Sequence, residues 1–212
     1  MKEQSREEYW TRFARSYDRD GEYVVGKPIL EAIEKRLLEE RCLGDVIEFG
    51  CGTGYFTKAI ARNAEHVIAT DLSDEMLKVA RMQLREFQNV TIQKADGTNT
   101  SFPTERFDSL FMANLIHVID SPSQCLRESH RILRDEGSLI VVDFTGYRMS
   151  CFDKVKLGFR YLRKWGVPPR HARNDISPHE LVLLVESAEF SVEDLQLIEN
   201  GSNALYLKGK KK

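Results

Sequence analysis

A short apolar run that ends in three alternating glycines constrains the fold of this chain more than any other feature. Residues 46–49 read Val-Ile-Glu-Phe and lead into Gly50, Gly52 and Gly54. Glycine accepts positive φ angles and lets a ligand approach the backbone closely. A helix that starts after such a turn adds free N–H groups and a partial positive charge. The pattern therefore predicts a buried strand, a tight turn and a helix from about residue 55, with a ligand at the turn.

The spacing of the glycines narrows the ligand class. Dinucleotide-binding turns have the spacing Gly-x-Gly-x-x-Gly, and phosphate-binding loops continue with Gly-Lys-Ser/Thr; this turn does neither. Glu48, just before the first glycine, would repel a pyrophosphate but attract an ammonium group. A strand-to-helix turn without a ligand is the alternative.

Strand-like and helix-like patterns alternate over the rest of the chain. Strands are expected at residues 46–49, 67–70, 90–93, 107–113 and 138–143, and helices at 29–40, 55–63, from 73 onward, at 121–133 and at 177–187. This alternation indicates a parallel sheet with helices on both faces. The final strands, 192–198 and 204–208, are joined by a short turn and must pair antiparallel. The predicted fold class is α/β, with a mostly parallel sheet and a reversed last strand.

The composition excludes several classes of function. The chain has 212 residues, with 31 Lys plus Arg against 33 Asp plus Glu and a formal net charge of -2. A surface that attracts nucleic acid or membranes as a whole is therefore not expected. The four cysteines, Cys42, Cys51, Cys125 and Cys151, form no CxxC pair, and no metal site is predicted. The chain shows no signal-peptide pattern and no long apolar run, so a reduced, cytoplasmic protein is expected.

Two aspartates follow predicted strands. Asp71 ends the second strand, where a carboxylate can accept hydrogen bonds from both hydroxyls of a ribose. Asp96 comes just after the third strand and can accept a hydrogen bond from an adenine amino group. A helix cap at Asp71 and a turn aspartate at Asp96 are the structural alternatives.

Together these motifs resemble those of the class I S-adenosylmethionine-dependent methyltransferases. The motifs that carry the resemblance are Glu48-x-Gly50-x-Gly52-x-Gly54, Asp71, Ala95-Asp96, the strand at 107–111 with residues 114–120, and residues 132–139 before the fifth strand. The chain looks similar to the small-molecule type, as in ubiquinone and menaquinone biosynthesis. Asp135-Glu136-Gly137 replaces the family's usual Pro-Gly-Gly, which affects a turn and leaves the subfamily open.

The resemblance implies a Rossmann-like sheet of seven strands and S-adenosylmethionine as cofactor, with S-adenosylhomocysteine as product. It assigns the glycine turn and Glu48 to the methionine portion, Asp71 to the ribose, and Asp96 with Gly97 to the adenine. The full implied set is Glu48, Gly50, Cys51, Gly52, Gly54, Asp71, Leu72, Asp96, Gly97 and Asn114. The implied organisation is a lid at 1–27, a methyltransferase domain at 28–208 with a substrate-side insertion near 146–175, and a tail at 209–212.

The N-terminal residues 3–17 are expected to form one helix with Tyr9, Phe13 and Tyr17 on one face, followed by a loop over 18–27. The segment resembles the lid of small-molecule methyltransferases. Tyr17 would close over the methionine portion, and the loop around Gly21 would act as the hinge. A stripe of core aromatic residues is the alternative.

His117 follows the fourth predicted strand, and the resemblance places it beside the transferable methyl group. It is the candidate general base, which an acceptor that carries a proton would need. A structural histidine is the alternative. His171 and His179 are weaker candidates, and His179 is expected to be exposed.

Residues 147–175 are both basic and aromatic. They hold eight Lys or Arg against two Asp, interleaved with Tyr147, Phe152, Phe159, Tyr161 and Trp165. Three interpretations stay open: a site for an anionic aromatic acceptor, a surface that lies on an anionic membrane and collects a lipophilic acceptor, or a solvated helical cover with a buried aromatic face. Nucleic acid is disfavoured because the whole chain is slightly acidic.

The sequence therefore predicts an enzyme that transfers a methyl group from S-adenosylmethionine to a small-molecule acceptor, which is aromatic, anionic or lipophilic. A nicotinamide-dependent oxidoreductase is the enzymatic alternative, and the glycine spacing argues against it. A cofactor-binding regulator with the same fold but no turnover is the other alternative. The sequence gives no indication of the oligomeric state.

Overall fold

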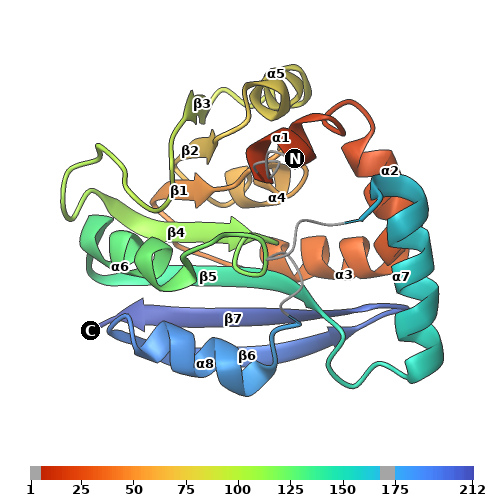
Figure 1. Cartoon of the computed structure of the whole chain (residues 1–212). Coiled ribbons are helices and arrows are strands. Elements are labelled where there is room, and N and C mark those ends of the chain that lie inside the picture. The colour runs from red at the N-terminus through yellow and green to blue at the C-terminus, as the bar shows by residue number, and fades with distance from the viewer. Residues whose placement is uncertain (1–5, 168–174) are drawn as a thin grey trace.

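A seven-stranded sheet forms the centre of the molecule (Figure 1). The computed structural model describes residues 6–167 and 175–212. The strands are β1 Asp45–Phe49, β2 His66–Asp71, β3 Val90–Lys94, β4 Phe107–Ala113, β5 Leu133–Thr145, β6 Phe190–Glu199 and β7 Asn203–Lys211. Their order is β3-β2-β1-β4-β5-β7-β6; the pairs among β1 to β5 are parallel, and β7 is antiparallel to both of its neighbours. The predicted fold class is confirmed.

Helices cover both faces of the sheet, as predicted. On one face lie α3 Lys27–Leu38, α4 Thr57–Ala61 and α5 Asp74–Gln83; on the other lie α6 Pro122–Ile132 and α8 Pro178–Glu186 (Figure 1). Successive residues of β5 alternate between two buried clusters, Ile140 with the first group of helices and Val141 with the second. This period of two is that of a strand packed on both sides.

The strand order reverses beside β1, and this reversal positions the site. The chain moves outward from β1 through β2 to β3, and then returns to place β4 on the other side of β1. The loops that leave β1 and β4 therefore diverge, which opens a crevice at the carboxyl ends of the strands.

The N-terminal segment differs from the prediction of one helix over 3–17 and a loop over 18–27. The structure has two helices, α1 Arg6–Thr11 and α2 Tyr17–Val25, joined by a turn. The N–H groups of Phe13 and Ser16 donate to the carbonyls three residues earlier and close this turn. Asp18 and Asp20 then lie in the first turn of α2, where carboxylates are favoured by the helix dipole. Gly21 lies inside α2, so the predicted hinge loop around it was wrong.

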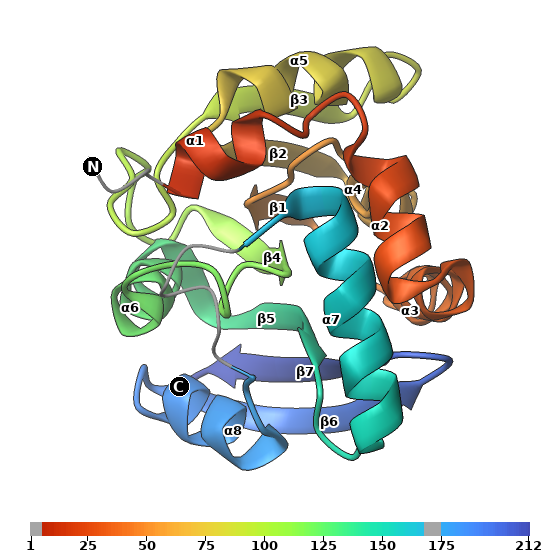
Figure 2. The same cartoon turned by 45° about the vertical axis from the view of Figure 1, so that its right-hand side comes forward.

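The basic and aromatic stretch contains one long helix, α7 Cys151–Trp165, which the Ser150 hydroxyl caps by accepting a hydrogen bond from the N–H of Asp153. Figure 2 shows α7 at the front of the molecule, with α2 and α3 beside it. The Lys164 ammonium binds the buried Asp20 carboxylate on α2 at 2.8 Å. Residues 168–174, with the candidate His171, lie outside the described residues.

The closing residues are part of the sheet rather than the solvated tail that was predicted. β7 continues to Lys211, because the strand finds partners in β6 as far as Phe190. The Lys211 side chain is buried, and its ammonium donates to the carbonyl of Leu133 at 2.8 Å.

The helices within the described ranges are too short or too polar to span a bilayer. The same residues hold no cluster of side chains that could bind a metal ion. All four cysteines are unpaired thiols. The cytoplasmic location stays a prediction.

Candidate functional site

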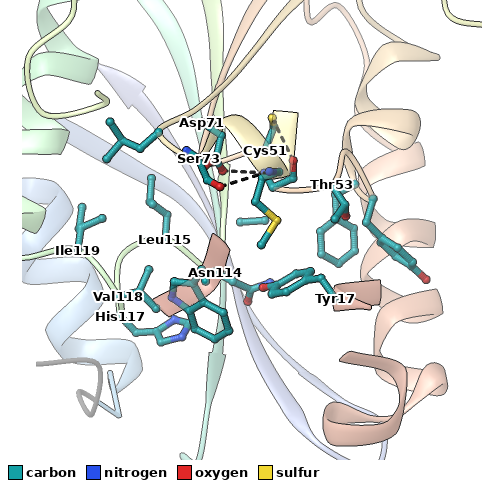
Figure 3. Close-up of a pocket in the computed structure, with 18 of the residues that line it drawn as sticks. Tyr17, Cys51, Thr53, Asp71, Ser73, Asn114, Leu115, His117, Val118 and Ile119 are labelled. Carbon is teal, nitrogen blue, oxygen red and sulfur yellow. Dashed lines mark hydrogen bonds between the residues drawn. The ribbon is translucent and has the colours of Figure 1, made fainter. Parts of the chain in front are cut away.

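A cavity of about 640 Å³ lies over the carboxyl ends of β1, β2 and β4. Its size is within the range typical of small-molecule sites. The residues that line it come from the loops after these strands, from α1 and α2, and from α7. Figure 3 shows Asp71, Ser73 and Cys51 at one end of the cavity and His117 at the other.

The glycine turn after β1 forms one wall of the cavity. The turn requires glycine, because its backbone takes positive φ angles that other residues rarely adopt. The φ angles are +70° at Gly50, +54° at Gly52 and +82° at Gly54. A Cβ at Gly50 would lie 2.9 Å from Leu115 Cδ1, and one at Gly54 would lie 2.6 Å from Leu84 Cδ1. A Cβ at Gly52 would meet no atom within 4 Å. Gly52 therefore presents bare backbone to open space in the cavity, as the sequence predicted for a turn that receives a ligand.

Asp71, at the end of β2, holds the glycine turn in place. One carboxylate oxygen accepts a hydrogen bond from the N–H of Gly52 at 2.9 Å, and the other accepts from the N–H of Ser73 at 2.8 Å. The helix cap of α5 is Ser73, whose hydroxyl accepts from the N–H of Met76. Asp71 is therefore not the cap itself. Asp71 also lines the cavity.

Glu48 lies beneath the turn and is almost fully buried. Its carboxylate accepts a hydrogen bond from the Thr57 hydroxyl at 2.7 Å. Burial raises the pKa of Glu48 to about 8; the Thr57 hydroxyl opposes this rise and the nearby Asp71 charge adds to it. Cys51 is also buried, and burial raises the pKa of its thiol well above the usual value. Cys51 is therefore no candidate nucleophile.

The loop after β3 also lines the cavity. One carboxylate oxygen of Asp96 accepts hydrogen bonds from the N–H and the hydroxyl of Thr98, at 2.9 and 2.7 Å. This is the turn geometry that the structural alternative described, although Asp96 also lines the cavity. A Cβ at Gly97 would lie 2.9 Å from the ring of Phe49. Leu72 lines the cavity nearby.

His117 is held by a carboxylate that the sequence analysis missed. Its Nδ1 forms a hydrogen bond with the carboxylate of Asp143, and its backbone N–H donates to the other oxygen of that group at 3.1 Å. Asp143 is fully buried near the end of β5. The sequence contains little indication of this role, because Asp143 follows four apolar residues and fits the pattern of a buried strand.

Asn114 also forms a hydrogen bond with β5. It has a φ of +54°, and its side-chain oxygen accepts a hydrogen bond from the N–H of Phe144 at 3.3 Å. Tyr17 points from the start of α2 towards Asn114 (Figure 3). His179, a weaker candidate, is exposed on α8, as expected, and does not line the cavity.

Aromatic side chains of α1, α2 and α7 roof the cavity together. The Tyr17 ring stacks on Trp165 with centroids 5.7 Å apart, and Trp10 meets both rings edge-on. Burial raises the pKa of the Tyr17 hydroxyl. The Trp165 side chain is buried, yet its indole N–H has no hydrogen-bond acceptor among the described residues.

Asp18 fastens this roof to the glycine turn. One of its carboxylate oxygens accepts a hydrogen bond from the Thr53 hydroxyl at 2.5 Å, and the other accepts from the Gln83 amide at 2.6 Å. No role was predicted for Asp18, because residues 18–27 were expected to form a loop. The contact joins α2, the glycine turn and α5 at one point.

Comparisons with known proteins agree with this geometry. A family model described as a methyltransferase domain matches residues 47–141. The demethylmenaquinone methyltransferase of Tropheryma whipplei (strain Twist) is 29% identical over 194 residues, which is 88% of this chain and 77% of that protein. The ubiquinone/menaquinone biosynthesis C-methyltransferase of Vibrio campbellii is 30% identical over 129 residues, 57% of this chain and 50% of that protein.

Solved structures share the fold. A SAM-dependent methyltransferase from Aquifex aeolicus superposes with a TM-score of 0.69 at 19% identity, covering 95% of this chain and 98% of that one. A SAM-dependent methyltransferase from Thermotoga maritima gives a TM-score of 0.72 at 24% identity, covering 96% of this chain and all of that one.

The raised pKa of Glu48 predicts a pH-dependent stability. Between about pH 4.5 and pH 8, folded Glu48 keeps a proton that the unfolded chain has lost. The free energy of unfolding should therefore fall as the pH rises through this window, by up to about 1.4 kcal/mol per pH unit. Glu48→Gln should flatten this part of the profile, measured by urea unfolding. Glu39→Gln, at an exposed position on the same protein, should keep the wild-type slope. Parallel profiles for wild type and Glu48→Gln would contradict the assignment.

Proposed function

The chain belongs to the class I S-adenosylmethionine-dependent methyltransferases, and we propose that it methylates a small, neutral, ring-bearing acceptor whose reacting atom carries a proton. The observation that carries this proposal is the contrast between the two ends of one cavity. Carboxylates and bare glycine backbone lie at one end, and aromatic rings with a carboxylate-held histidine lie at the other.

The first end fits the three polar parts of S-adenosylmethionine. The backbone at Gly52 has room for an amino-acid portion, and Glu48 lines the cavity beside it. An ammonium group bound there would lower the raised pKa of Glu48 and favour its ionised form. Asp71 would accept from the ribose hydroxyls, and Asp96 with Gly97 would border the adenine. Leu72 and Leu115 supply apolar walls on which a ring can lie. When bound, the cofactor supplies a methyl group on a sulfonium, whose positive charge disappears on transfer.

The second end supports an acceptor with an apolar body. Tyr17, Phe144, Tyr161 and Trp165 line it, and the described lining includes no lysine or arginine. A carboxylated acceptor would therefore lose its hydration without gaining a partner. The unpartnered N–H of buried Trp165 costs free energy unless a ligand atom accepts from it. We infer a ring that carries an oxygen acceptor, such as a carbonyl or a hydroxyl.

His117 and Asp143 support a proton-transfer step. An acceptor hydroxyl must lose its proton as its oxygen bonds to the methyl carbon, and a neutral imidazole can take that proton. Asp143 bonds Nδ1 of His117, which leaves Nε2 as the acceptor nitrogen and stabilises the imidazolium that forms. The roof of α1, α2 and α7 would exclude water while the reacting atoms align.

The alternatives gain no support from these observations. A non-catalytic regulator would gain support if the 147–175 segment filled the cavity beside His117, but α7 borders an open space of about 640 Å³. The glycine spacing and the antiparallel closing strands still argue against a nicotinamide-dependent oxidoreductase.

A screen of acceptors tests the proposal directly. Wild-type protein with S-adenosylmethionine is offered neutral hydroxylated rings and their carboxylated counterparts, and the release of S-adenosylhomocysteine is measured. We expect turnover of the neutral compounds, because the described cavity offers no cation to a carboxylate. Preference for the carboxylated members would contradict the acceptor class.

Asp71→Ala tests the cofactor end. Loss of the carboxylate should weaken S-adenosylmethionine binding by about 1–3 kcal/mol, the usual cost of leaving buried polar groups without a partner. Isothermal titration calorimetry measures this without turnover. Asp74→Ala is the matched control, because its exposed carboxylate pairs with Lys94 outside the cavity. Unchanged affinity in Asp71→Ala would remove this residue from the site.

His117→Ala and Asp143→Asn test the acceptor end. Both should lower kcat, His117→Ala by about 10²–10⁴-fold, with cofactor affinity unchanged. Asp143→Asn should also change the pH dependence of kcat, because the amide no longer stabilises the imidazolium. His179→Ala, on the exposed surface of α8, is the control. Full activity of His117→Ala across the pH range would reject the base role.

A further inference from the structure

The outward side of α7 carries a continuous apolar stripe. The side chains of Phe152, Val155, Phe159 and Leu162 are 76%, 71%, 64% and 51% exposed. Their spacings of three and four residues place them in one line along the helix. We call these four residues the α7 outer stripe. Exposed apolar residues are common singly, but a contiguous line of four on one helix marks an interaction surface.

The opposite side of the same helix is already occupied. Leu157, Tyr161 and Trp165 face inward and line the cavity. The Trp165 carbonyl and the Tyr161 hydroxyl also bond the Tyr9 hydroxyl of α1. The outer stripe is therefore neither core nor cavity lining. Figure 2 shows α7 at the front of the molecule, with no other helix or strand drawn in front of it.

Cations border the outer stripe. Lys156 is four residues after Phe152, and Arg163 is four residues after Phe159, so both side chains lie next to the stripe. Both are exposed, and neither forms an ion pair with a carboxylate in the described part of the chain. By contrast, Arg160 and Lys164 turn towards Tyr23 on α2.

The charge of α7 is opposite to that of the whole protein. The helix contains five lysines and arginines, and its single carboxylate, Asp153, bonds the capping Ser150 hydroxyl at 2.6 Å. The whole chain has a net charge of -2. The helix is therefore a local basic surface on a slightly acidic protein.

We propose that the α7 outer stripe docks this protein onto an anionic lipid bilayer, with the helix lying in the plane of the interface. The rings of Phe152 and Phe159 would enter the boundary of the acyl chains while Lys156 and Arg163 bind headgroup phosphates. The 15 residues of α7 extend about 22 Å, too short to cross a hydrocarbon core of about 30 Å. A line of exposed apolar side chains bordered by exposed cations matches an anionic bilayer surface, which offers both headgroup phosphates and an apolar interior.

Docking in this way would place the cavity next to the membrane, because the inner side of α7 is a wall of the cavity. An apolar acceptor dissolved in the bilayer would then reach the site without crossing water. This consequence rests on the proposed function, whereas the docking itself does not.

Vesicle flotation tests the docking without any assay of turnover. The full chain is mixed with phosphatidylcholine vesicles that either contain or lack about one third phosphatidylglycerol, at low and high salt. We expect flotation with the anionic vesicles and less with the neutral ones. The double variant Phe152→Ser with Phe159→Ser should bind at least about tenfold more weakly. The matched control, Met82→Ser with Leu183→Ser, removes equally exposed apolar side chains from α5 and α8 and should float like wild type.

A charge variant distinguishes binding to anionic lipid from nonspecific hydrophobic adsorption. Lys156→Glu with Arg163→Glu should reduce binding to anionic vesicles by about tenfold or more. Lys35→Glu with Arg85→Glu, at exposed positions outside α7, makes the same change in net charge and should reduce it far less. Circular dichroism melting shows that each variant is folded.

Three results would overturn the proposal. The wild type could fail to float with anionic vesicles, or both control variants could lose binding as strongly as the α7 variants. Light scattering could also reveal a wild-type dimer that the Phe152→Ser and Phe159→Ser variant disperses, which would make the stripe a contact between two copies.

Discussion

The two hydrogen bonds that Asp71 accepts, from Gly52 and Ser73, hold the functional end of this molecule together. They join the turn after β1 to the start of α5 at the point where the strand order reverses. The turn itself is possible only because its glycines accept positive φ angles. The cavity floor is thus fixed before any ligand arrives, which limits the ordering cost of binding. The Asp71 carboxylate that shapes the floor is also our proposed hydrogen-bond acceptor for the ribose. One side chain would therefore both hold the turn in place and bind the cofactor.

The roof of the cavity depends on contacts between segments far apart in the sequence. Asp18 on α2 binds Thr53 of the glycine turn, and the buried Asp20 binds Lys164 of α7. Stacking of Tyr17 on Trp165 completes the cover. Because α7 both covers the cavity and carries the exposed outer stripe, one helix connects the site to the surface that we propose for the membrane. The proposed acceptor end is lined by aromatic side chains, and the lysines and arginines of α7 do not line the cavity.

Most of the sheet could be predicted, because β1, β2, β4 and β5 each contain a short apolar run. The positions of the glycine turn and of Asp71 could be predicted for the same reason, since the turn begins just after β1 and Asp71 is the last residue of β2. The break between α1 and α2 could not, because the spacing of Tyr9, Phe13 and Tyr17 continues the helical period across the turn. Asp143 could not be predicted as the partner of His117, because the two residues are far apart in the sequence and come together only when β4 and β5 pair. The aromatic content of 147–175 was evident, but only the packed helix separates Trp165 inside from Phe159 outside.

The central claim is that the crevice above β1 and β2 holds S-adenosylmethionine. Calorimetric titration of the wild-type protein with S-adenosylmethionine, and separately with a nicotinamide dinucleotide, tests it most directly. The account predicts saturable binding of one S-adenosylmethionine per chain and no binding of the dinucleotide. Binding of the dinucleotide with no heat from S-adenosylmethionine would contradict it.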